Sequence, residues 1–255
     1  MDNFLKKFNS DYLRYVVNGI FLESPNYYKR YKSRYYSIMK AIVSFRLSKN
    51  SKILEIGGGQ IALLAGKMLG VYATVCDVSD INRSYVEKLG FSFMKLDLVK
   101  DEPFCSDNYD VVILSEVIEH IPIPPYLVFD KVRKMLCDDG TLILTTPNLY
   151  SIRNLVHLFM GKKLFGSFFY PSPGEYCREH VLEYSLDHLE WQLARAGFTN
   201  IKINYCQFHH NPNKLFFKIL YWIGIPIFLI PRFRQNLMCI AKKRTLLKCK
   251  KKKNG

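Results

Sequence analysis

Two carboxylates and an imidazole lie close together in the segment SEVIEHI, residues 115–121. Glu116, Glu119 and His120 directly follow the apolar run Val111–Leu114. If the chain turns helically there, their spacing of i, i+3 and i+4 puts all three side chains on one side. The imidazole could act as a general base near neutral pH, and the group could also bind a divalent metal. A structural alternative has Glu116 lining a ligand pocket while Glu119 and His120 cap the following loop.

A glycine cluster forms a second candidate site in the segment LEIGGGQIA, residues 54–62. Gly57, Gly59 and Ala62 fit the pattern G-x-G-x-x-A between a strand-like run and a helix-like run. Glycines there permit a tight turn and let a ligand approach the backbone. The glycine pattern alone does not distinguish a dinucleotide-binding site from a site for another ligand. Asp77, twenty positions after Gly57, is suited to ribose hydroxyls, and Asp97 could meet an adenine amino group.

The elements that would position these residues alternate between strand and helix. Strands are expected at 52–56, 73–78, 91–98, 109–117, 140–147, 201–206 and 236–243. Helices are expected at 25–48, 61–69, 125–136 and 184–198. Pro125 suits a first helical turn, and Ser185 and Gly197 suit the start and the stop of the 184–198 helix. This alternation predicts an α/β fold with a parallel sheet.

Five segments between residues 50 and 245 resemble, in their order and spacing, the successive motifs of class I S-adenosylmethionine-dependent methyltransferases. They are ILEIGGGQ, CDV, KLDL, DVVILSEVIEHI and GTLILTTPN. Within this family the chain is similar to sugar and quinone O-methyltransferases of the type 11/12-like groups. The resemblance implies a doubly wound, Rossmann-like sheet of seven strands, mostly parallel, with the last strand, 236–243, antiparallel. Gln60 and Ile61 depart from the glycine or serine that many members have there.

The same resemblance implies S-adenosylmethionine as cofactor and a set of residues that would bind it. The methionine part would be held by Glu55, Gly57 and Gly59, the ribose by Asp77, the adenine by Asp97 and Leu98, with Glu116 lining the pocket. A nicotinamide-binding domain is the alternative, but nothing after residue 98 is typical of a hydride-transfer site.

The E-x-x-E-H pattern followed by a distant histidine also resembles the metal site of small-RNA terminal 2′-O-methyltransferases. A similar E-V-x-E-H occurs in ubiquinone-pathway O-methyltransferases. This resemblance implies Glu116, Glu119, His120 and His180 as ligands of Mg, Mn, Fe or Zn. A metal would lower the pKa of a coordinated alcohol. Catalysis by His120 and Glu119 without a metal remains open.

The chain divides into a central domain with appendages. Residues 1–49 are expected to form a helical lid and 50–245 the methyltransferase domain. Within that domain, 148–184 would shape the acceptor side, and 213–233 form an apolar insert. Residues 246–255 form a basic tail.

The net charge of +15 is concentrated at the two ends. Residues 1–50 carry ten Lys and Arg against three acids, and 213–255 carry twelve and no acid, so the middle has a net charge of −4. This distribution argues against a protein that is basic throughout and binds nucleic acid. In the Tyr-rich stretch from 27 to 36 and beyond, Tyr28, Tyr31, Tyr35, Ile38, Met39 and Ile42 have helical spacing, which favours a packed lid helix over RNA stacking.

Cysteine usage and the apolar insert predict a location. Seven scattered cysteines and an N-terminus without a signal-peptide pattern indicate a cytoplasmic protein with reduced thiols. Residues 215–231 are too short and too interrupted to span a bilayer, which needs about 20 apolar residues. With the basic tail they could bind an anionic membrane surface peripherally at its inner face, or simply pack on the protein.

These features favour one function and leave two alternatives. The favoured function is O-methylation of a small-molecule or lipid-linked acceptor: a sugar of a lipid-linked glycan or surface polysaccharide, or an isoprenoid quinol. The alternatives are metal-dependent RNA 2′-O-methylation and a non-catalytic membrane adaptor on a methyltransferase fold.

Overall fold

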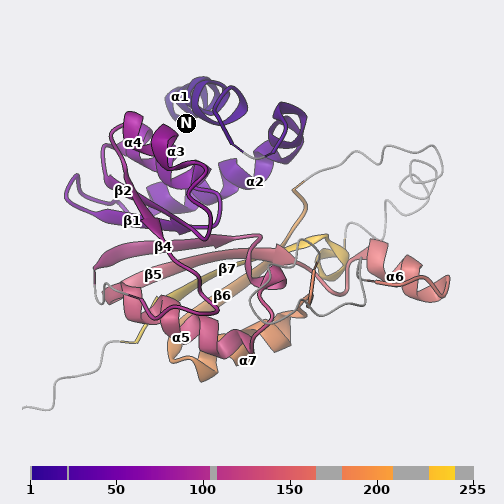
Figure 1. Ribbon diagram of the computed structural model, residues 1–255. Helices are drawn as coiled ribbons and strands as arrows, with labels where there is room; N and C mark the ends of the chain where they lie inside the picture. The colour runs from indigo at the N-terminus through magenta and orange to yellow at the C-terminus, as the bar shows by residue number, and fades with distance from the viewer. Residues whose placement is uncertain (1, 22, 104–107, 165–179, 209–229, 245–255) are drawn as a thin grey trace, which may run out of the picture.

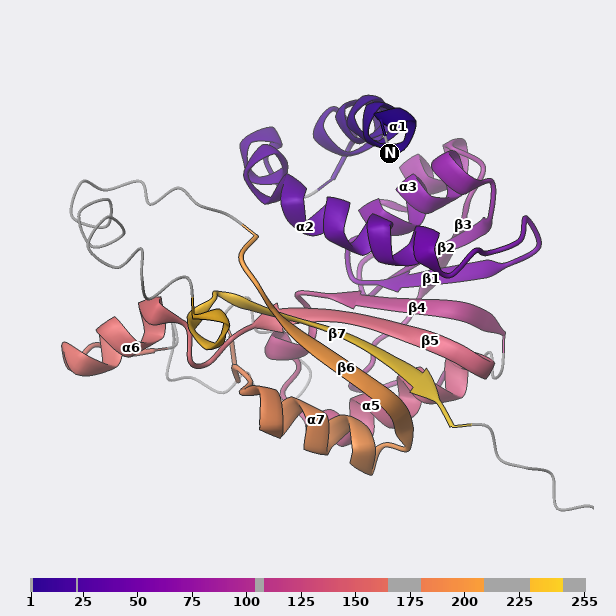
Figure 2. The same cartoon turned by 180° about the vertical axis from the view of Figure 1, so that it is seen from behind.

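A single seven-stranded sheet forms the centre of the molecule, with helices on both faces (Figures 1 and 2). The computed structural model describes residues 2–21, 23–103, 108–164, 180–208 and 230–244. The strands are β1 Lys52–Ile56, β2 Tyr72–Asp77, β3 Ser92–Lys95, β4 Tyr109–Ser115, β5 Leu136–Pro147, β6 Phe198–Cys206 and β7 Asn236–Lys243. Their order across the sheet is β3-β2-β1-β4-β5-β7-β6.

The direction of the strands confirms the expected fold. β1, β2, β3, β4 and β5 pair in parallel, whereas β7 runs antiparallel to both of its neighbours, β5 and β6. β1 and β4 lie side by side in the middle, with Ile53 opposite Val111 and Ile56 opposite Leu114. Because both faces of these strands are covered by helices, their apolar residues form continuous runs.

Helices divide between the two faces of the sheet. They are α1 Asp2–Tyr12, α2 Pro25–Ser44, α3 Gln60–Leu69, α4 Arg83–Lys88, α5 Pro125–Met135, α6 Ile152–Phe159 and α7 Leu186–Arg195. Short helical turns occur at η1 Leu13–Val17, η2 Ile118–His120 and η3 Pro231–Phe233. α1, α2 and α3 cover one face, α5 and α7 cover the other, and α6 projects away from the body (Figures 1 and 2).

Local sequence signals explain several helix ends. Pro125 occupies the first turn of α5, and the Ser185 hydroxyl accepts a hydrogen bond from the His188 backbone N–H at the start of α7. Gly197 follows α7 with a left-handed φ of 87°. These three expectations are confirmed. Each residue supplies a backbone geometry or a capping group that the helix end requires.

The N-terminal helices pack tightly against the sheet. Tyr28, Tyr35, Ile38, Met39 and Ile42 of α2 are buried and Tyr31 is half-buried, which confirms that this helix is packed on the protein. Together with α1 and α3 they form the apolar core on this face. The Tyr-rich stretch therefore uses its rings mainly for packing.

The expected membrane-binding segments, 215–231 and the tail 246–255, lie outside the described residues except for positions 230 and 231. No helix within the described ranges has the length and apolar character needed to cross a bilayer.

Candidate active site

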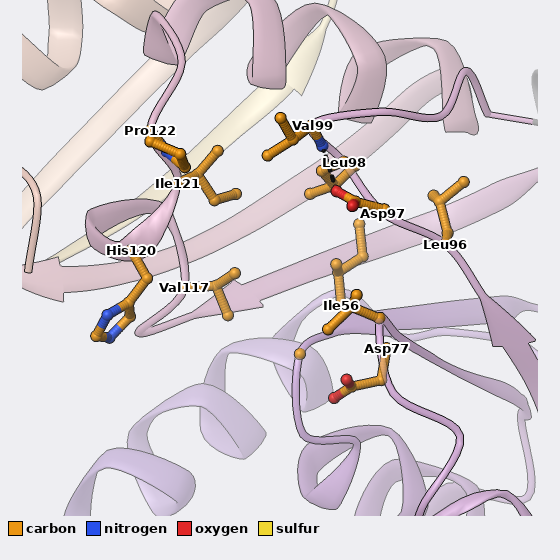
Figure 3. Close-up of a pocket in the computed structure, with 12 residues that line it drawn as sticks. Ile56, Asp77, Leu96, Asp97, Leu98, Val99, Val117, His120, Ile121 and Pro122 are labelled. Carbon is orange, nitrogen blue, oxygen red and sulfur yellow. Dashed lines mark hydrogen bonds between the residues drawn. The ribbon is translucent and has the colours of Figure 1, made fainter. Parts of the chain in front are cut away.

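Two adjoining cavities lie at the carboxyl ends of β1, β2 and β4, where open α/β sheets bind ligands. The larger has a volume of about 220 Å³ and the smaller about 180 Å³. Gly57 and Asp77 line both, so the cavities are neighbouring parts of one site. Figure 3 shows the larger cavity, with Asp77, Asp97 and Leu98 on one side and His120 across from them.

The glycine loop between β1 and α3 forms the floor that the cavities share. Gly57 and Gly59 have left-handed φ angles of 78° and 97°. A Cβ on Gly57 would lie 2.5 Å from a methyl carbon of Val117, and one on Gly59 would lie 2.5 Å from a methyl carbon of Val75. Larger residues would therefore be both strained and overpacked here. The loop keeps its backbone open to the site because it carries no side chains.

Two aspartates at the ends of neighbouring strands are held in place by backbone N–H groups. Asp77 accepts hydrogen bonds from the N–H of Gly58 at 3.1 Å and of Ser79 at 2.9 Å. Asp97 accepts one from the N–H of Val99 at 2.8 Å. These bonds fix each carboxylate at the rim of the larger cavity before any ligand arrives.

Glu55 lies beneath the glycine loop and is almost completely buried. Its Oε2 accepts a hydrogen bond from the N–H of Ala62 at 2.7 Å, in the first turn of α3. Burial raises the pKa of Glu55 to about 8, although hydrogen bonds from nearby N–H groups oppose the shift. The carboxyl group also lines the smaller cavity. Glu55 therefore holds the first turn of α3 in place and also borders the binding site.

A buried arginine on α2 forms one wall of the smaller cavity. Arg34 is 4% exposed, and its Nη1 lies 3.5 Å from Oε2 of Glu116. The rings of Tyr27, Tyr31 and Tyr35 lie 5.9, 5.2 and 5.2 Å from the guanidinium carbon. Burial lowers the pKa of Arg34, but Glu116 and the tyrosines outweigh it and raise the pKa overall. The arginine therefore remains charged inside the protein.

The chain after β4 departs from the expected helical turn. Glu116 adopts a left-handed φ of 55°, and the short turn η2 begins only at Ile118. The N–H of Glu116 still bonds to the carbonyl of Thr145 at 2.9 Å, which continues the pairing with β5. Because of this kink, Glu116 does not share one helical face with Glu119 and His120. It contacts Arg34 and accepts a hydrogen bond from Asn236 at 3.3 Å.

Glu119, His120 and His180 come together beside the larger cavity. Their potential ligand atoms all lie within 4.8 Å of one another, and the two imidazole centroids are 5.0 Å apart. The N–H of Val181 donates to the carbonyl oxygen of Glu119 at 2.7 Å, which brings the distant His180 to this position. The arrangement can hold a cation or take up a proton.

Glu119 is the buried member of this group. It is 1% exposed, and Oε2 accepts a hydrogen bond from the Thr146 hydroxyl at 3.1 Å, whereas Oε1 has no hydrogen-bond partner among the described residues. Burial raises the pKa of Glu119 well above its ordinary value, and the charge of Glu116 adds to the shift. A buried carboxyl group with an unused oxygen is costly unless a ligand or proton satisfies it.

The residues selected from the sequence fall into two sets in the structure. Those expected to bind the cofactor line one or both cavities, except Gly59, which fixes the loop between them: Glu55, Gly57, Asp77, Asp97, Leu98 and Glu116. Of the four expected metal ligands, three come together, and Glu116 lies with Arg34 instead. Residues 165–179 of the acceptor-side segment 148–184 lie outside the described residues.

Sequence reasoning missed two groups. Arg34 is three positions from Tyr31 and four from Ile38, so helical spacing could have placed it on the buried face. Glu183, whose Oε1 lies 2.8 Å from Nδ1 of His180, had no such local signal. Its position depends on how residues 180–183 return to the end of β4.

Several solved structures with the same fold are methyltransferases. A SAM-dependent methyltransferase from Archaeoglobus fulgidus is 18% identical, with a TM-score of 0.54, 86% of this chain covered and 99% of that one. Phosphoethanolamine N-methyltransferase 2 from Haemonchus contortus, in complex with S-adenosyl-L-methionine, is 14% identical, with a TM-score of 0.56, 83% of this chain covered and 52% of that one. A further SAM-dependent methyltransferase, from Mesorhizobium loti, is 14% identical with a TM-score of 0.53, over 82% of this chain and 97% of that one.

Sequence comparison gives the family directly. No curated protein matches the chain. The model of a methyltransferase domain matches residues 28–203, which include the glycine loop, both aspartates and the Glu119–His120–His180 group. The chain therefore belongs to the methyltransferase domain family and is a class I S-adenosylmethionine-dependent methyltransferase.

Proposed function

We propose that this protein transfers a methyl group to an oxygen atom of its acceptor and that Glu119, His120 and His180 activate the acceptor hydroxyl. One observation carries the proposal. His120 lines the same cavity as Asp77 and Asp97, and it also belongs to a compact group of one carboxyl and two imidazoles. A group that can remove a proton or hold a cation therefore reaches the proposed cofactor cavity through His120.

The residues around the two cavities fit S-adenosylmethionine. Asp77 would accept hydrogen bonds from the ribose hydroxyls, and Asp97 with Leu98 would border the adenine. In the smaller cavity the methionine part would lie over Gly57, with its carboxylate toward Arg34 and its ammonium group toward Glu116. The glycine loop leaves room for the methionine part to approach the backbone, since it carries no side chains. A Cβ at Gly57 would already meet Val117 without any ligand. Buried ion pairs of this kind fix the orientation of a zwitterionic group.

The second group fits a divalent metal by its chemistry. Glu119 has a buried oxygen without a hydrogen-bond partner among the described residues, and two imidazoles lie beside it. Carboxylate and imidazole ligands suit Mn, Fe and Zn. Such an ion, when bound, lowers the pKa of an alcohol. Glu119, His120 and His180 would hold it, while Glu116 is engaged elsewhere.

The protein residues have separate tasks in the transfer. S-adenosylmethionine supplies an electrophilic methyl group, and the acceptor oxygen becomes a stronger nucleophile as it loses its proton. When no ion is bound, His120, which lies at the cavity wall, is placed to receive that proton, which then leaves to solvent. Glu119 and His180 stabilise the charge that develops on His120 and orient the hydroxyl. The sulfur takes the electron pair of the broken bond, so S-adenosylhomocysteine leaves as a neutral thioether.

The acceptor and location proposed from the sequence agree with this chemistry. A sugar of a lipid-linked glycan or surface polysaccharide and an isoprenoid quinol both present a hydroxyl. We place the reaction at the cytoplasmic face of a membrane, because 215–231 and the basic tail have the composition of an interfacial segment.

Calorimetric titration with S-adenosylhomocysteine tests the cofactor site. Asp77→Ala should weaken binding about 10- to 100-fold, because hydrogen bonds to a charged group contribute about 1.5–3 kcal/mol. Asp80→Ala is the matched control, since Asp80 is exposed and its Oδ2 lies 3.9 Å from Lys95 Nζ. Equal affinities for wild type and Asp77→Ala would contradict the placement of the ribose.

Metal-dependent activity tests the acceptor side. With hydroxyl-bearing glycolipids and quinols as substrates, activity should fall in chelator and return with Mn or Zn, and both Glu119→Gln and His180→Ala should abolish it. His157→Gln on α6 is the control. If the wild type kept full activity in chelator but His120→Ala lost activity, His120 would act as a base without a metal. Methyl transfer only to amine acceptors would overturn the proposal.

A further inference from the structure

A buried carboxylate lies directly behind His180 and outside the group that faces the cavity. Glu183 is 5% exposed. Its Oε1 lies 2.8 Å from Nδ1 of His180, and its Oε2 accepts a short hydrogen bond from Nδ2 of Asn154. Both oxygens therefore have partners, and Glu183 is not one of the three residues whose ligand atoms cluster within 4.8 Å.

Asn154 can act only as a donor to Glu183. Its Nδ2 also lies 3.2 Å from the carbonyl oxygen of Leu149 and 3.4 Å from that of Asn148. Three acceptor oxygens surround this nitrogen, so the amide orientation is set by its neighbours. Asn154 is buried in the first turns of α6, where the Ser151 hydroxyl caps the helix. The base of α6 thus holds the carboxylate in place.

This geometry determines which nitrogen of His180 carries hydrogen. A carboxylate has no hydrogen to donate, so the contact with Glu183 requires an N–H at Nδ1. Nε2 then keeps its lone pair in the neutral ring. The backbone bond from Val181 to Glu119 keeps the ring beside the other two side chains.

We propose that Glu183, held by Asn154, is a positioning residue that fixes His180 in the Nδ1–H tautomer and leaves Nε2 as the atom presented to the acceptor-activating group. The role of this tautomer in activating the acceptor rests on the proposed function. The tautomer itself does not, because it can be measured without metal, cofactor or acceptor. A hydrogen-bonded partner behind a ligating imidazole fixes the ring and raises its basicity.

The isosteric variant Glu183→Gln should reverse the tautomer. Asn154 presents a donor to this position, so the carbonyl oxygen of the introduced glutamine must turn toward Asn154 and its NH₂ group toward His180. That NH₂ donates to Nδ1, which forces the hydrogen of the neutral ring onto Nε2. The opposite orientation would place two donors, the glutamine NH₂ and Asn154 Nδ2, against each other. A change of one atom would thereby remove the lone pair from Nε2.

Two-dimensional ¹H–¹⁵N NMR of the imidazoles reads the tautomer directly. The chain has only six histidines, and a His180→Gln spectrum assigns the signal. At about pH 9, above the ordinary histidine pKa of about 6.5, wild-type His180 should show the Nδ1–H pattern, and Glu183→Gln should show Nε2–H. Glu87→Gln on α4, with the same charge change at an exposed site, should leave the wild-type pattern.

Metal binding gives a second readout. Calorimetric titration with Mn or Zn should show about a 10- to 100-fold loss of affinity in both Glu183→Gln and Glu183→Ala, as expected for loss of an outer-shell partner. S-adenosylhomocysteine affinity and the urea midpoint, measured on the same samples, identify a variant that has simply lost its fold.

The outcomes separate this inference from the proposed function. An Nε2–H pattern in wild type, or an unchanged Nδ1–H pattern in Glu183→Gln, overturns the role of Glu183. If the tautomer reverses as expected but no variant, including wild type, binds a divalent ion, the positioning role stands and the metal part of the proposed function fails.

Discussion

Glu55 shows how a single buried side chain makes stability depend on pH. Its carboxyl group has a pKa near the ordinary 4.5 in the unfolded chain and about 8 in the folded protein. Between these values the folded protein holds a proton that the unfolded chain has released. Unfolding therefore releases a proton, and rising pH favours it. The contribution of Glu55 is fully present below about pH 4.5 and is lost as the pH rises through about 8.

Replacing Glu55 by glutamine should remove this dependence. We expect the difference in unfolding free energy, wild type minus Glu55→Gln, to fall between about pH 5 and about pH 8, because the variant has no proton to lose. Urea denaturation at the two pH values measures it. The pKa of Glu119 is also raised, so its contribution to stability changes with pH in the same direction. Because Glu119 is present in both proteins, that contribution cancels in the difference. A difference that does not change with pH would mean that Glu55 is ionised in the folded state.

At the scale of single residues, the sequence predicts which residues belong to the site better than it predicts the contacts that they make. Asp77, Asp97 and Gly57 could be selected because each occupies a strand end, and parallel strands bring such ends to one edge. Glu116 could be selected but not oriented, since its left-handed φ depends on a kink that no local pattern indicates. Glu183 could not be selected, because Asn154 lies 29 positions away in the sequence and meets it only in the folded chain, although His180 is three positions away.

The two ends of α3 offer a comparison at the scale of one element. Gly59 precedes this helix and Gly70 follows it, and both have left-handed backbone conformations. Their surroundings differ, because a Cβ on Gly59 would lie 2.5 Å from a methyl carbon of Val75 whereas a Cβ on Gly70 would meet nothing within 4 Å. The same substitution should therefore have two different effects.

Gly70→Ala should cost only the left-handed strain, about 1–2 kcal/mol, and leave S-adenosylhomocysteine affinity unchanged. Gly59→Ala should add about 1–3 kcal/mol of overpacking and move the loop, so cofactor affinity should also fall. Urea unfolding and calorimetry on both variants measure the two effects. If Gly70→Ala lost as much cofactor affinity as Gly59→Ala, the effect would come from the helix as a whole.

Elements were predictable where a local signal matched a backbone requirement. The bounds of β1 and β7 agree with the sequence, and Pro125, Ser185 and Gly197 act at helix ends as expected. β3 ends at Lys95, earlier than the expected 98, because the chain turns at Asp97, where the side chain accepts hydrogen bonds from Val99 and Lys100. Such aspartate turns compete with strand geometry, and spacing alone does not show which prevails.

On the scale of the whole molecule, α6 and the residue after it carry exposed apolar side chains. The helix projects from the body (Figures 1 and 2), and Leu158, Phe159 and Met160 at its end are 63%, 95% and 49% exposed. Exposed lysines follow at 162 and 163, and no acidic residue occurs from 140 to 174. An apolar tip with basic neighbours suits the surface of an anionic membrane.

We therefore expect the protein to float with vesicles that contain anionic lipid and to be released by salt. Phe159→Ser should reduce binding about 10- to 100-fold, because burying a phenylalanine contributes about 1.5–3 kcal/mol. Tyr72→Ser is the control, since Tyr72 is 64% exposed at the amino end of β2, on the opposite edge of the sheet. Equal recovery with neutral and anionic vesicles would contradict the proposed location.

The strand order also has a consequence for how the protein is made. β6 joins the sheet through β7, which lies between it and β5, yet β7 is the last of these strands to be synthesised. Until Lys243 has left the ribosome, the nascent chain has β6 without its partner and β5 with an open edge. At about 5–20 residues per second this interval lasts a few seconds, in which chaperones or other chains can pair with the exposed edges. A premature stop before Asn236 would thus remove two strands from the sheet, although the message encodes all but one.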